Sequence, residues 1–460
     1  MTTLGTTTKS PPRDRVLPMH LNAAEHLWLA QDLPGYPSTF VIQLEFNGQI
    51  DRPVWEDSLG EALDRHPLLR AYIRPGKQDR PCWQAAPEQL PPIDWSAEGA
   101  PIICPRGEAI DLAHETALRM WVRIGVDRVR ILLQFHHAAC DGTGAYRFIG
   151  DLLATYADRI EENSFRPTLA PVRLPLLRSR TERLLGSRPV GWRAGLALGY
   201  RVVFRHPVPL AAPSEGRSDS SADDFPGFLS QLLDRAAATE LRSAADARGA
   251  TLNDLLLRDL FLTMREWNER HGSKSRQRFA IMMPTDMRDS QDCEMPAANL
   301  TSYNFLSRDS RSFDKPDDLL ASIQAETSRI KSDRLGTKFM SAVNWMSRKS
   351  KLLPFVASRN VCLATAVLSN AADPSRRFTA KFRREAGRIV AGDLVLESIT
   401  GVPPLRPKTR ATFSISQYQR RLTVSLRCDP SCFTLEDAAA LLNLYMERIR
   451  KSAAVPTNRD

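Results

Sequence analysis

The sequence lacks the features that mark several common classes of protein. No run of eighteen apolar residues occurs among its 460 residues, which predicts that no helix spans a membrane. It contains no GxGxxG motif, no Walker loop and no HExxH pair, so no motif in it indicates a bound nucleotide or metal cofactor. Residues 1–15 have no apolar stretch typical of a signal peptide, which favours a cytoplasmic protein.

Cysteine is scarce, and its spacing excludes the usual roles of paired thiols. The seven cysteines include no CxxC pair, and their odd number favours reduced thiols. Cys428 and Cys432 lie four residues apart but have no histidine nearby to complete a zinc site. The sequence therefore predicts neither a disulfide framework nor a metal centre.

Histidine is also rare, yet two of the eight histidines are adjacent. His136 and His137 are followed four residues later by Asp-Gly. The residues before them, Arg128 to Phe135, alternate and then merge into an apolar run, which predicts a partly buried strand. Residues Ala145 to Ile160 carry one apolar face at helical spacing. The pair is thus expected at a strand end, on a turn that leads into a helix.

This placement suits acid–base chemistry. Histidine titrates near neutral pH, so it can take a proton from a hydroxyl, an amine or a thiol. A helix N-terminus offers free N–H groups and partial positive charge to a developing oxyanion. Asp141 could orient an imidazole or hold the loop through a cation. The alternative is a buried, purely structural histidine pair ahead of an Asp-Gly turn.

The run His136 to Gly142 resembles the HHxxxDG signature of the condensation-domain superfamily. That superfamily includes nonribosomal peptide condensation domains, wax-ester synthase/diacylglycerol acyltransferases and alcohol acetyltransferases. Weaker resemblances to other blocks of the family follow in the family's order: His66 to Arg70, Ala250 to Leu257, Met283 to Arg288 with Asn299, Leu368 to Asn370, and Leu422 to Phe433. The resemblance implies a mixed α/β fold of two chloramphenicol-acetyltransferase-like lobes with a central channel.

The resemblance also implies roles for individual residues. His137 matches the histidine expected to act as general base, or else by positioning and electrostatics. His136 would be structural or supportive. Asp141 would form a buried ion pair, with Arg288 as its partner by motif, and Gly142 would allow substrate and backbone to approach closely. The late Asn-Val-Pro-Gly-Pro and Asp-Phe-Gly-Trp-Gly blocks of some members are missing, which leaves the substrate class open.

Composition suggests how the chain is divided. We expect a flexible tail over 1–16, an N-terminal lobe over 17–165, a Pro- and Arg-rich crossover over 166–224, a C-terminal lobe over 225–452 and a tail over 453–460. The clearest single element is a C-terminal helix, because Thr434 and Asp437 form a capping pattern ahead of regularly spaced apolar residues.

The crossover carries much of the formal net charge of +10. Its arginines are expected to bind anionic groups, namely Arg173, Arg178, Arg180, Arg183, Arg188, Arg193, Arg201 and Arg205. The anion could belong to a membrane surface, or to coenzyme A or an acyl carrier protein. The alternative is a merely solvated crossover. Nucleic acid is not expected as a partner, because no recognised motif accompanies the charge.

Together these observations predict a stand-alone acyltransferase of lipid or secondary metabolism. It would move an acyl group from a thioester, acyl-CoA by preference, to a hydroxyl or amine acceptor. The alternatives are a condensation-like domain that uses a carrier-bound donor, and a non-catalytic module that binds carrier proteins. The enzyme is expected in the cytoplasm, with peripheral membrane contact as an option.

Overall fold

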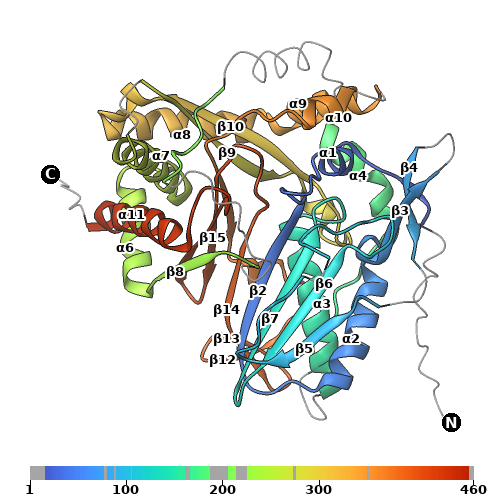
Figure 1. The fold of residues 1–460 in the computed structure, drawn as a ribbon. Helices are drawn as coiled ribbons and strands as arrows, with labels where there is room; N and C mark the ends of the chain where they lie inside the picture. Colours follow the sequence, from blue (N-terminus) through green and yellow to red (C-terminus); the bar gives the residue numbers. More distant parts are fainter. Residues whose placement is uncertain are drawn as a thin grey trace, which may run out of the picture.

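The structure is a computed structural model that describes residues 16–76, 80–86, 90–104, 106–160, 166–186, 206–213, 225–272, 276–349 and 352–454. Its strands form two large sheets and one small one. The large sheets lie in two lobes, side by side in Figure 1, and each lobe has its own apolar core. The predicted mixed α/β, two-lobed fold is therefore confirmed.

The first lobe is built on a seven-stranded sheet. Its strands, in order across the sheet, are β12 (Arg383–Glu385), β13 (Arg388–Ala391), β14 (Leu394–Val402), β2 (Thr39–Asn47), β7 (Arg128–His136), β6 (Leu118–Ile124) and β5 (Ile93–Ala97). The predicted strand over Arg128 to Phe135 is β7. A small sheet beside it contains β1 (Met19–His20), β4 (Pro81–Ala85) and β3 (Ala71–Pro75).

Three strands of the first lobe come from the second half of the chain. The strand β14 pairs antiparallel with β2, for example Ile399 with Leu44, and β13 and β12 extend the sheet beyond it. Figure 1 shows β14 beside β2 between the two lobes. The boundary expected at residue 225 therefore needs correction for 383–402, because backbone pairing places this segment in the N-terminal lobe.

The second lobe is built on a six-stranded sheet. Its strands, in order, are β10 (Thr301–Asp309), β9 (Arg278–Asp286), β11 (Ala366–Ala372), β15 (Ala411–Tyr418), β16 (Arg421–Cys428) and β8 (Leu229–Leu233). The antiparallel pair β9 and β10 encloses a loop over residues 287–300. This loop includes the predicted loop over Ser290 to Ala298 and reaches the first lobe, where it meets the histidine motif.

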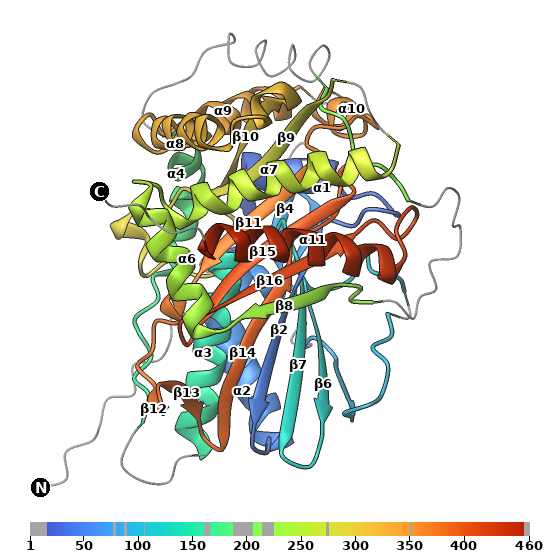
Figure 2. The ribbon, with the colours of Figure 1, turned by 90° about the vertical axis from the view of Figure 1, so that its left-hand side faces the viewer.

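Helices cover the outer faces of both sheets. In the first lobe α2 (Arg52–Arg65) and α3 (Gly142–Ile160) pack side by side. Figure 2 shows three helices over the second sheet, α6 (Arg235–Ala247), α7 (Leu252–Arg270) and α11 (Leu435–Ala454). The predicted cap of α11 is present, since Thr434 and Asp437 each bond the other's backbone N–H.

The remaining helices lie in the upper part of Figure 1. They are α1 (Ala23–Ala30), α4 (Arg180–Leu185), α8 (Pro316–Ser332), α9 (Gly336–Ser347) and α10 (Leu352–Ala357). Short 3-10 turns lie at η2 (Pro67–Arg70), η4 (Leu174–Ser179), η6 (Ser290–Asp292), η7 (Ser310–Phe313) and η8 (Pro374–Arg377). Among the described helices, none is long and apolar enough to cross a membrane.

Candidate active site

The histidine motif sits where the first lobe meets the second. Strand β7 ends at His136, a turn follows, and α3 begins at Gly142, three residues earlier than its apolar pattern predicted. The backbone N–H of His137 donates to the Ser38 carbonyl oxygen at 2.8 Å. The predicted arrangement of strand end, turn and helix start is therefore confirmed.

His136 is a fully buried structural residue. Its Nδ1 accepts a hydrogen bond from the Ala138 N–H at 3.0 Å, which places the ring hydrogen on Nε2. Nε2 lies 3.1 Å from a carboxylate oxygen of Asp32, and the other Asp32 oxygen accepts from the Ser38 N–H at 2.7 Å. These bonds tie the turn to the segment that follows α1.

His137 lies in an aromatic enclosure. The Trp28 indole stacks on its imidazole, with ring centroids 4.0 Å apart and planes 11° from parallel, and the Phe40 ring lies 4.9 Å away. Burial lowers the pKa of His137 to about 4, despite the opposing influence of the Asp141 carboxylate. The ring is therefore neutral at pH 7.

Asn299 fixes how the neutral ring carries its hydrogen. The Asn299 oxygen accepts from the Thr301 N–H at 3.0 Å, so its NH₂ group must face His137. That NH₂ lies 2.6 Å from the His137 carbonyl oxygen and 3.1 Å from Nδ1. Because an NH₂ group only donates, Nδ1 is the acceptor and the hydrogen sits on Nε2.

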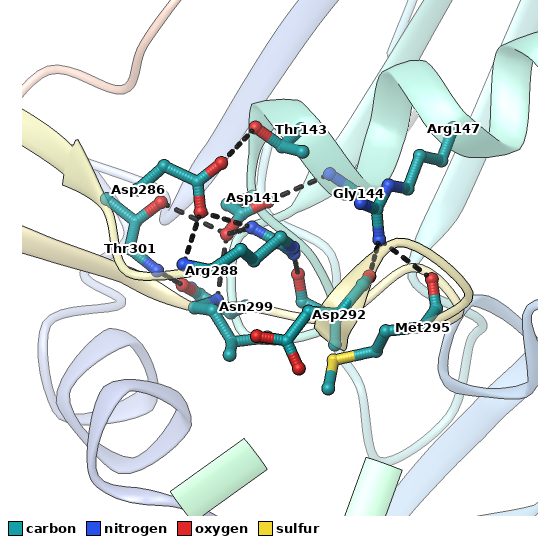
Figure 3. A network of polar contacts seen from close by, with 12 residues as sticks. Asp141, Thr143, Gly144, Arg147, Asp286, Arg288, Asp292, Met295, Asn299 and Thr301 are labelled. Atoms are coloured by element: carbon teal, nitrogen blue, oxygen red, sulfur yellow. Dashed lines mark hydrogen bonds and ion pairs between the residues drawn. The ribbon is translucent and has the colours of Figure 1, made fainter. Parts of the chain in front are cut away.

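Asp141 is the centre of a buried polar network, drawn in Figure 3. One carboxylate oxygen accepts from the Gly144 N–H at 2.8 Å. The other accepts from the Arg288 guanidinium at 2.8 Å, the Leu300 N–H at 2.8 Å and the Thr301 hydroxyl at 3.1 Å. Burial opposes ionisation, but Arg288 and the N–H donors outweigh it, so the pKa of Asp141 lies below its ordinary value.

Arg288 joins this network to the second lobe. Besides Asp141, its guanidinium donates to Asp286 at 3.0 Å and to the Ala298 carbonyl oxygen at 2.8 Å. The opposing carboxylates hold the pKa of Arg288 above its ordinary value against the effect of burial. The pairing of Asp141 with Arg288, expected from the family resemblance, is present.

Gly142, the last residue of the motif, and Gly144, two residues further on, differ in what surrounds them. A Cβ added at Gly142 would meet only the Tyr146 ring, at 3.8 Å, so the protein leaves room there. A Cβ at Gly144 would lie 2.9 Å from the Ala298 oxygen and 3.0 Å from its nitrogen. The space beside Gly142 is therefore open, while Gly144, which the sequence did not single out, is needed for contact between the lobes.

A cavity of about 150 Å³ opens beside His137 and is walled by both lobes. The first lobe contributes His137, Gly142 and Thr143, and the second contributes Asp286 and Ser369. The Thr143 hydroxyl donates to Asp286 at 2.9 Å across the junction. The cavity thus brings the histidine, the start of α3 and the second lobe to one place.

The four crossover arginines that the structure describes interact with other residues of the protein. Arg180 is buried and its guanidinium bonds Glu25 at 2.6 and 3.0 Å, so its predicted role in docking is wrong. Arg183 pairs with Asp289 and Asp292, and Arg173 lies 3.9 Å from Glu294. Arg178 also has an interaction partner. The remaining four lie outside the described residues: Arg188, Arg193, Arg201 and Arg205.

Sequence reasoning missed three side chains that shape the site. Trp28 reads as an ordinary core residue, and Asn299 reads only as part of a family block. The sequence around Asp32 gives no sign that this carboxylate bonds His136. The apolar pattern around Trp28 predicts a helix but does not indicate that the indole contacts His137. Of the three residues, Asn299 alone could have been found from the sequence, through the family resemblance.

Comparisons with known proteins give distant relatives. No family model matches the chain. An uncharacterized protein of Mycobacterium tuberculosis is 24% identical over 292 residues, which are 62% of this chain and 65% of that protein. A probable non-canonical nonribosomal peptide synthetase of Salinispora arenicola is 28% identical over 261 residues, which are 52% of this chain but 3% of the synthetase. The chain thus spans less than two thirds of the curated relatives it matches.

Solved structures resemble the chain over nearly its whole length. The first condensation domain of the calcium-dependent antibiotic synthetase has a TM-score of 0.68 at 15% identity, covering 96% of this chain and 97% of that one. Polyketide synthase associated protein 5 from M. tuberculosis has a TM-score of 0.61 at 14% identity, covering 95% and 98%. A starter condensation domain of rhizomide synthetase, solved with C8-CoA and Leu-SNAC, has 0.62 at 14%, covering 96% of both. The chain therefore shares the two-lobed fold of these solved structures.

Proposed function

We propose that this chain is an acyltransferase that moves an acyl group from a thioester donor to a hydroxyl or amine acceptor. One observation carries the proposal: a neutral His137 faces a cavity between the lobes, with Nδ1 held by Asn299. Nε2 has no hydrogen-bond partner in the part of the chain that the structure describes. Nε2–H is therefore the group that the ring offers to a substrate.

The reaction needs no covalent enzyme intermediate. The acceptor oxygen or nitrogen attacks the thioester carbonyl carbon, the carbonyl oxygen gains negative charge, and the carbon–sulfur bond then breaks. The proton lost by the acceptor ends on the departing sulfur, so the products are an ester or amide and a thiol. Cys140 takes no part, because burial raises the pKa of its thiol well above the ordinary value.

In this proposal His137 acts as a hydrogen-bond donor. A general base works best with a pKa near the working pH, and burial has lowered the pKa of His137 to about 4. Its Nε2–H is directed instead to the oxygen that becomes negative, as in an oxyanion hole. This choice favours positioning and electrostatics over the general-base role, the two options expected from the resemblance.

The start of α3 adds to the same electrostatic field. Gly142 and Thr143 line the cavity at the helix N-terminus, where the backbone dipole favours negative charge. Asp141 and Arg288 hold this turn in place, but their charges largely cancel within the buried network. We assign them a positioning role.

Acyl-CoA is the donor that we favour. A structural relative, the starter condensation domain, was solved with C8-CoA, and this supports a coenzyme A thioester here. The nonribosomal peptide relatives support the alternative, a carrier-protein-bound donor. A carrier-binding module without activity is the third candidate.

The test is release of free thiol from acyl-CoAs of increasing chain length, with mixed alcohols and amines as acceptors. His137→Ala should lower acceptor-dependent release at least about tenfold, and a lost oxyanion donor typically costs about 100-fold or more. His114→Ala is the matched control, because that histidine is exposed and bonds only Asp111 among the described residues. Unchanged release in His137→Ala would overturn the role of His137. Turnover confined to a phosphopantetheinyl carrier would identify the carrier-bound thioester as the donor. No turnover with either donor would favour the third candidate, a carrier-binding module without activity.

A further inference from the structure

A second cavity, of about 90 Å³, lies behind Trp28 and is not part of the site described above. It is enclosed by α1, α9, α10 and the strand β10. Its walls are mainly apolar side chains: Leu27, Phe305, Phe339, Val343, Leu353 and Ala357. An apolar cavity of this kind favours an apolar occupant over water.

Trp28 forms the wall between this cavity and the reactive histidine. Its indole lines the apolar cavity and at the same time stacks on His137 at 4.0 Å. His137 lines the other cavity, the one between the lobes. A molecule bound behind Trp28 therefore lies one aromatic ring away from the imidazole.

One buried hydrogen-bond donor at this wall lacks an acceptor. The Trp28 indole N–H faces the Tyr303 hydroxyl oxygen, outside the geometry of an ordinary hydrogen bond, and the Tyr303 hydroxyl has no acceptor of its own among the described residues. The two side chains meet edge to face, with ring centroids 5.9 Å apart, and both are almost fully buried. Burial raises the pKa of Tyr303, so its hydroxyl remains a donor. An unpaired buried donor is destabilising, and a ligand oxygen would satisfy it.

Arg406 adds a positive charge at the same place. Its guanidinium carbon lies 5.9 Å from the Trp28 ring centroid, and it donates a hydrogen bond to Gln31. Among the described residues Arg406 forms no ion pair, and the Asp32 carboxylate, which acts on it from farther away, is already bonded to His136 and Ser38. Burial lowers the pKa of Arg406 to about 10, so it stays charged at neutral pH.

The polar end of the cavity thus contains a hydroxyl donor and a cation. A carboxylate matches both groups, whereas an ammonium group would face a like charge. We propose that this cavity binds a free aliphatic carboxylate, with its chain among the apolar side chains and its carboxylate toward Tyr303 and Arg406. Because Trp28 separates this cavity from His137, this ligand is distinct from the thioester whose carbonyl meets His137 in the proposed function.

Binding can be tested without turnover, with octanoate and octylamine as probes in calorimetric titrations of the full chain. Octanoate should bind at least about tenfold more tightly than octylamine. Ala357→Phe fills the cavity and should weaken octanoate at least about tenfold. Ser358→Phe, on the exposed neighbouring position, is the matched control and should leave octanoate binding unchanged. If Ala357→Phe does not fold, Ala357→Leu takes its place.

The polar end has its own variant. Tyr303→Phe keeps the ring and removes the hydroxyl, and it should weaken octanoate about threefold to tenfold, the worth of one hydrogen bond. Equal affinity for octylamine and octanoate, or no effect of Tyr303→Phe, would overturn the assignment of an oxygen to this end.

The two proposals can fail separately. If octanoate binding depends on Ala357 while no thioester is turned over, the cavity assignment stands and the acyltransferase proposal fails. If acyl-CoA is turned over, but Ala357→Phe changes neither octanoate binding nor the preference among acetyl-, octanoyl- and longer acyl-CoAs, the cavity assignment is overturned. A shift of that preference toward acetyl-CoA in Ala357→Phe, with Ser358→Phe unchanged, would show that the donor's chain enters this cavity and would overturn the assignment of a separate carboxylate.

Discussion

Arg288 and Asp141, 147 residues apart in the sequence, form an ion pair in which a guanidinium nitrogen lies 2.8 Å from a carboxylate oxygen. Both side chains are almost fully buried. Asp141 belongs to the turn after β7 in the first lobe, and Arg288 to the β9–β10 loop of the second. The pair therefore links the histidine turn to the opposite lobe.

Removing the cation should leave a buried carboxylate without its charge partner. Arg288→Ala is expected to lower the free energy of unfolding by about 3–5 kcal/mol. Urea titrations would measure this, with Arg265→Ala as control. Arg265 pairs with the exposed Asp314, and such a surface pair is worth about 1 kcal/mol or less. Equal losses in the two variants would show that the Asp141 pair has no special weight.

The pH dependence of activity should reflect the lowered pKa of His137. A histidine that acted as a general base with an ordinary pKa of about 6.5 would become charged, and lose that role, below that pH. With a pKa of about 4, His137 stays neutral down to nearly that value. We expect kcat/KM to be flat between about pH 5 and 7. An acidic limb near pH 6.5 that disappears in His137→Gln would contradict this.

Stability should depend on the same group with a defined sign. The unfolded chain binds a proton at His137 below about pH 6.5, whereas the folded chain does so only near pH 4. Acid therefore favours the unfolded state, and this contribution grows as the pH falls from about 6.5 to about 4, by at most about 1.4 kcal/mol per pH unit. His137→Gln should show a smaller loss of unfolding free energy over that range, measured by urea titration at each pH.

Asn299 should control the tautomer of His137. Asn299→Asp replaces the NH₂ donor by an acceptor, which favours a hydrogen on Nδ1 and raises the pKa of the ring. Nitrogen-15 NMR of labelled histidine should show Nε2–H in the wild type and an Nδ1-protonated ring in the variant. The rate of acyl transfer by Asn299→Asp should be at least about tenfold lower than that of the wild type. Asn344→Asp on the half-buried face of α9 is the control, and a wild-type spectrum with Nδ1–H would refute the assignment.

Gly144 should tolerate a methyl group poorly. In Gly144→Ala the new Cβ would press on the Ala298 backbone, and overpacking of this kind costs about 1–3 kcal/mol. Gly142→Ala meets nothing closer than 3.8 Å and should leave the unfolding free energy nearly unchanged. The melting temperatures of the two variants, measured by thermal unfolding, test this difference. Similar melting temperatures would show that the Ala298 backbone moves to accommodate the added methyl group.

Local patterns predicted the elements that carry the site. The alternation before His136 identified β7, the helical spacing after Gly142 identified α3, and the pair Thr434 and Asp437 identified the start of α11. Each of these depends on residues close in the sequence, where periodicity and capping act. The partner of Asp141 came from the family resemblance and not from spacing.

Contacts between distant segments could not be predicted in this way. Asn299 meets His137 across 162 residues, and nothing in the local sequence of either specifies the encounter. Arg180 is buried against Glu25, which lies 155 residues away in the sequence. The composition of the arginine-rich segment therefore could not show that one of its arginines is internal. Strand β14 reads as a strand, but its sheet is set by pairing with β2.

The pairing of β14 with β2 also bears on how the chain is made. A ribosome releases β2 and β7 early, but the other edge of β2 has no partner until residues 394–402 emerge, more than 300 residues later. During that interval the nascent first lobe exposes an open strand edge, which is a template for association with other chains. Chaperone capture during synthesis would protect this edge until the late strand closes it.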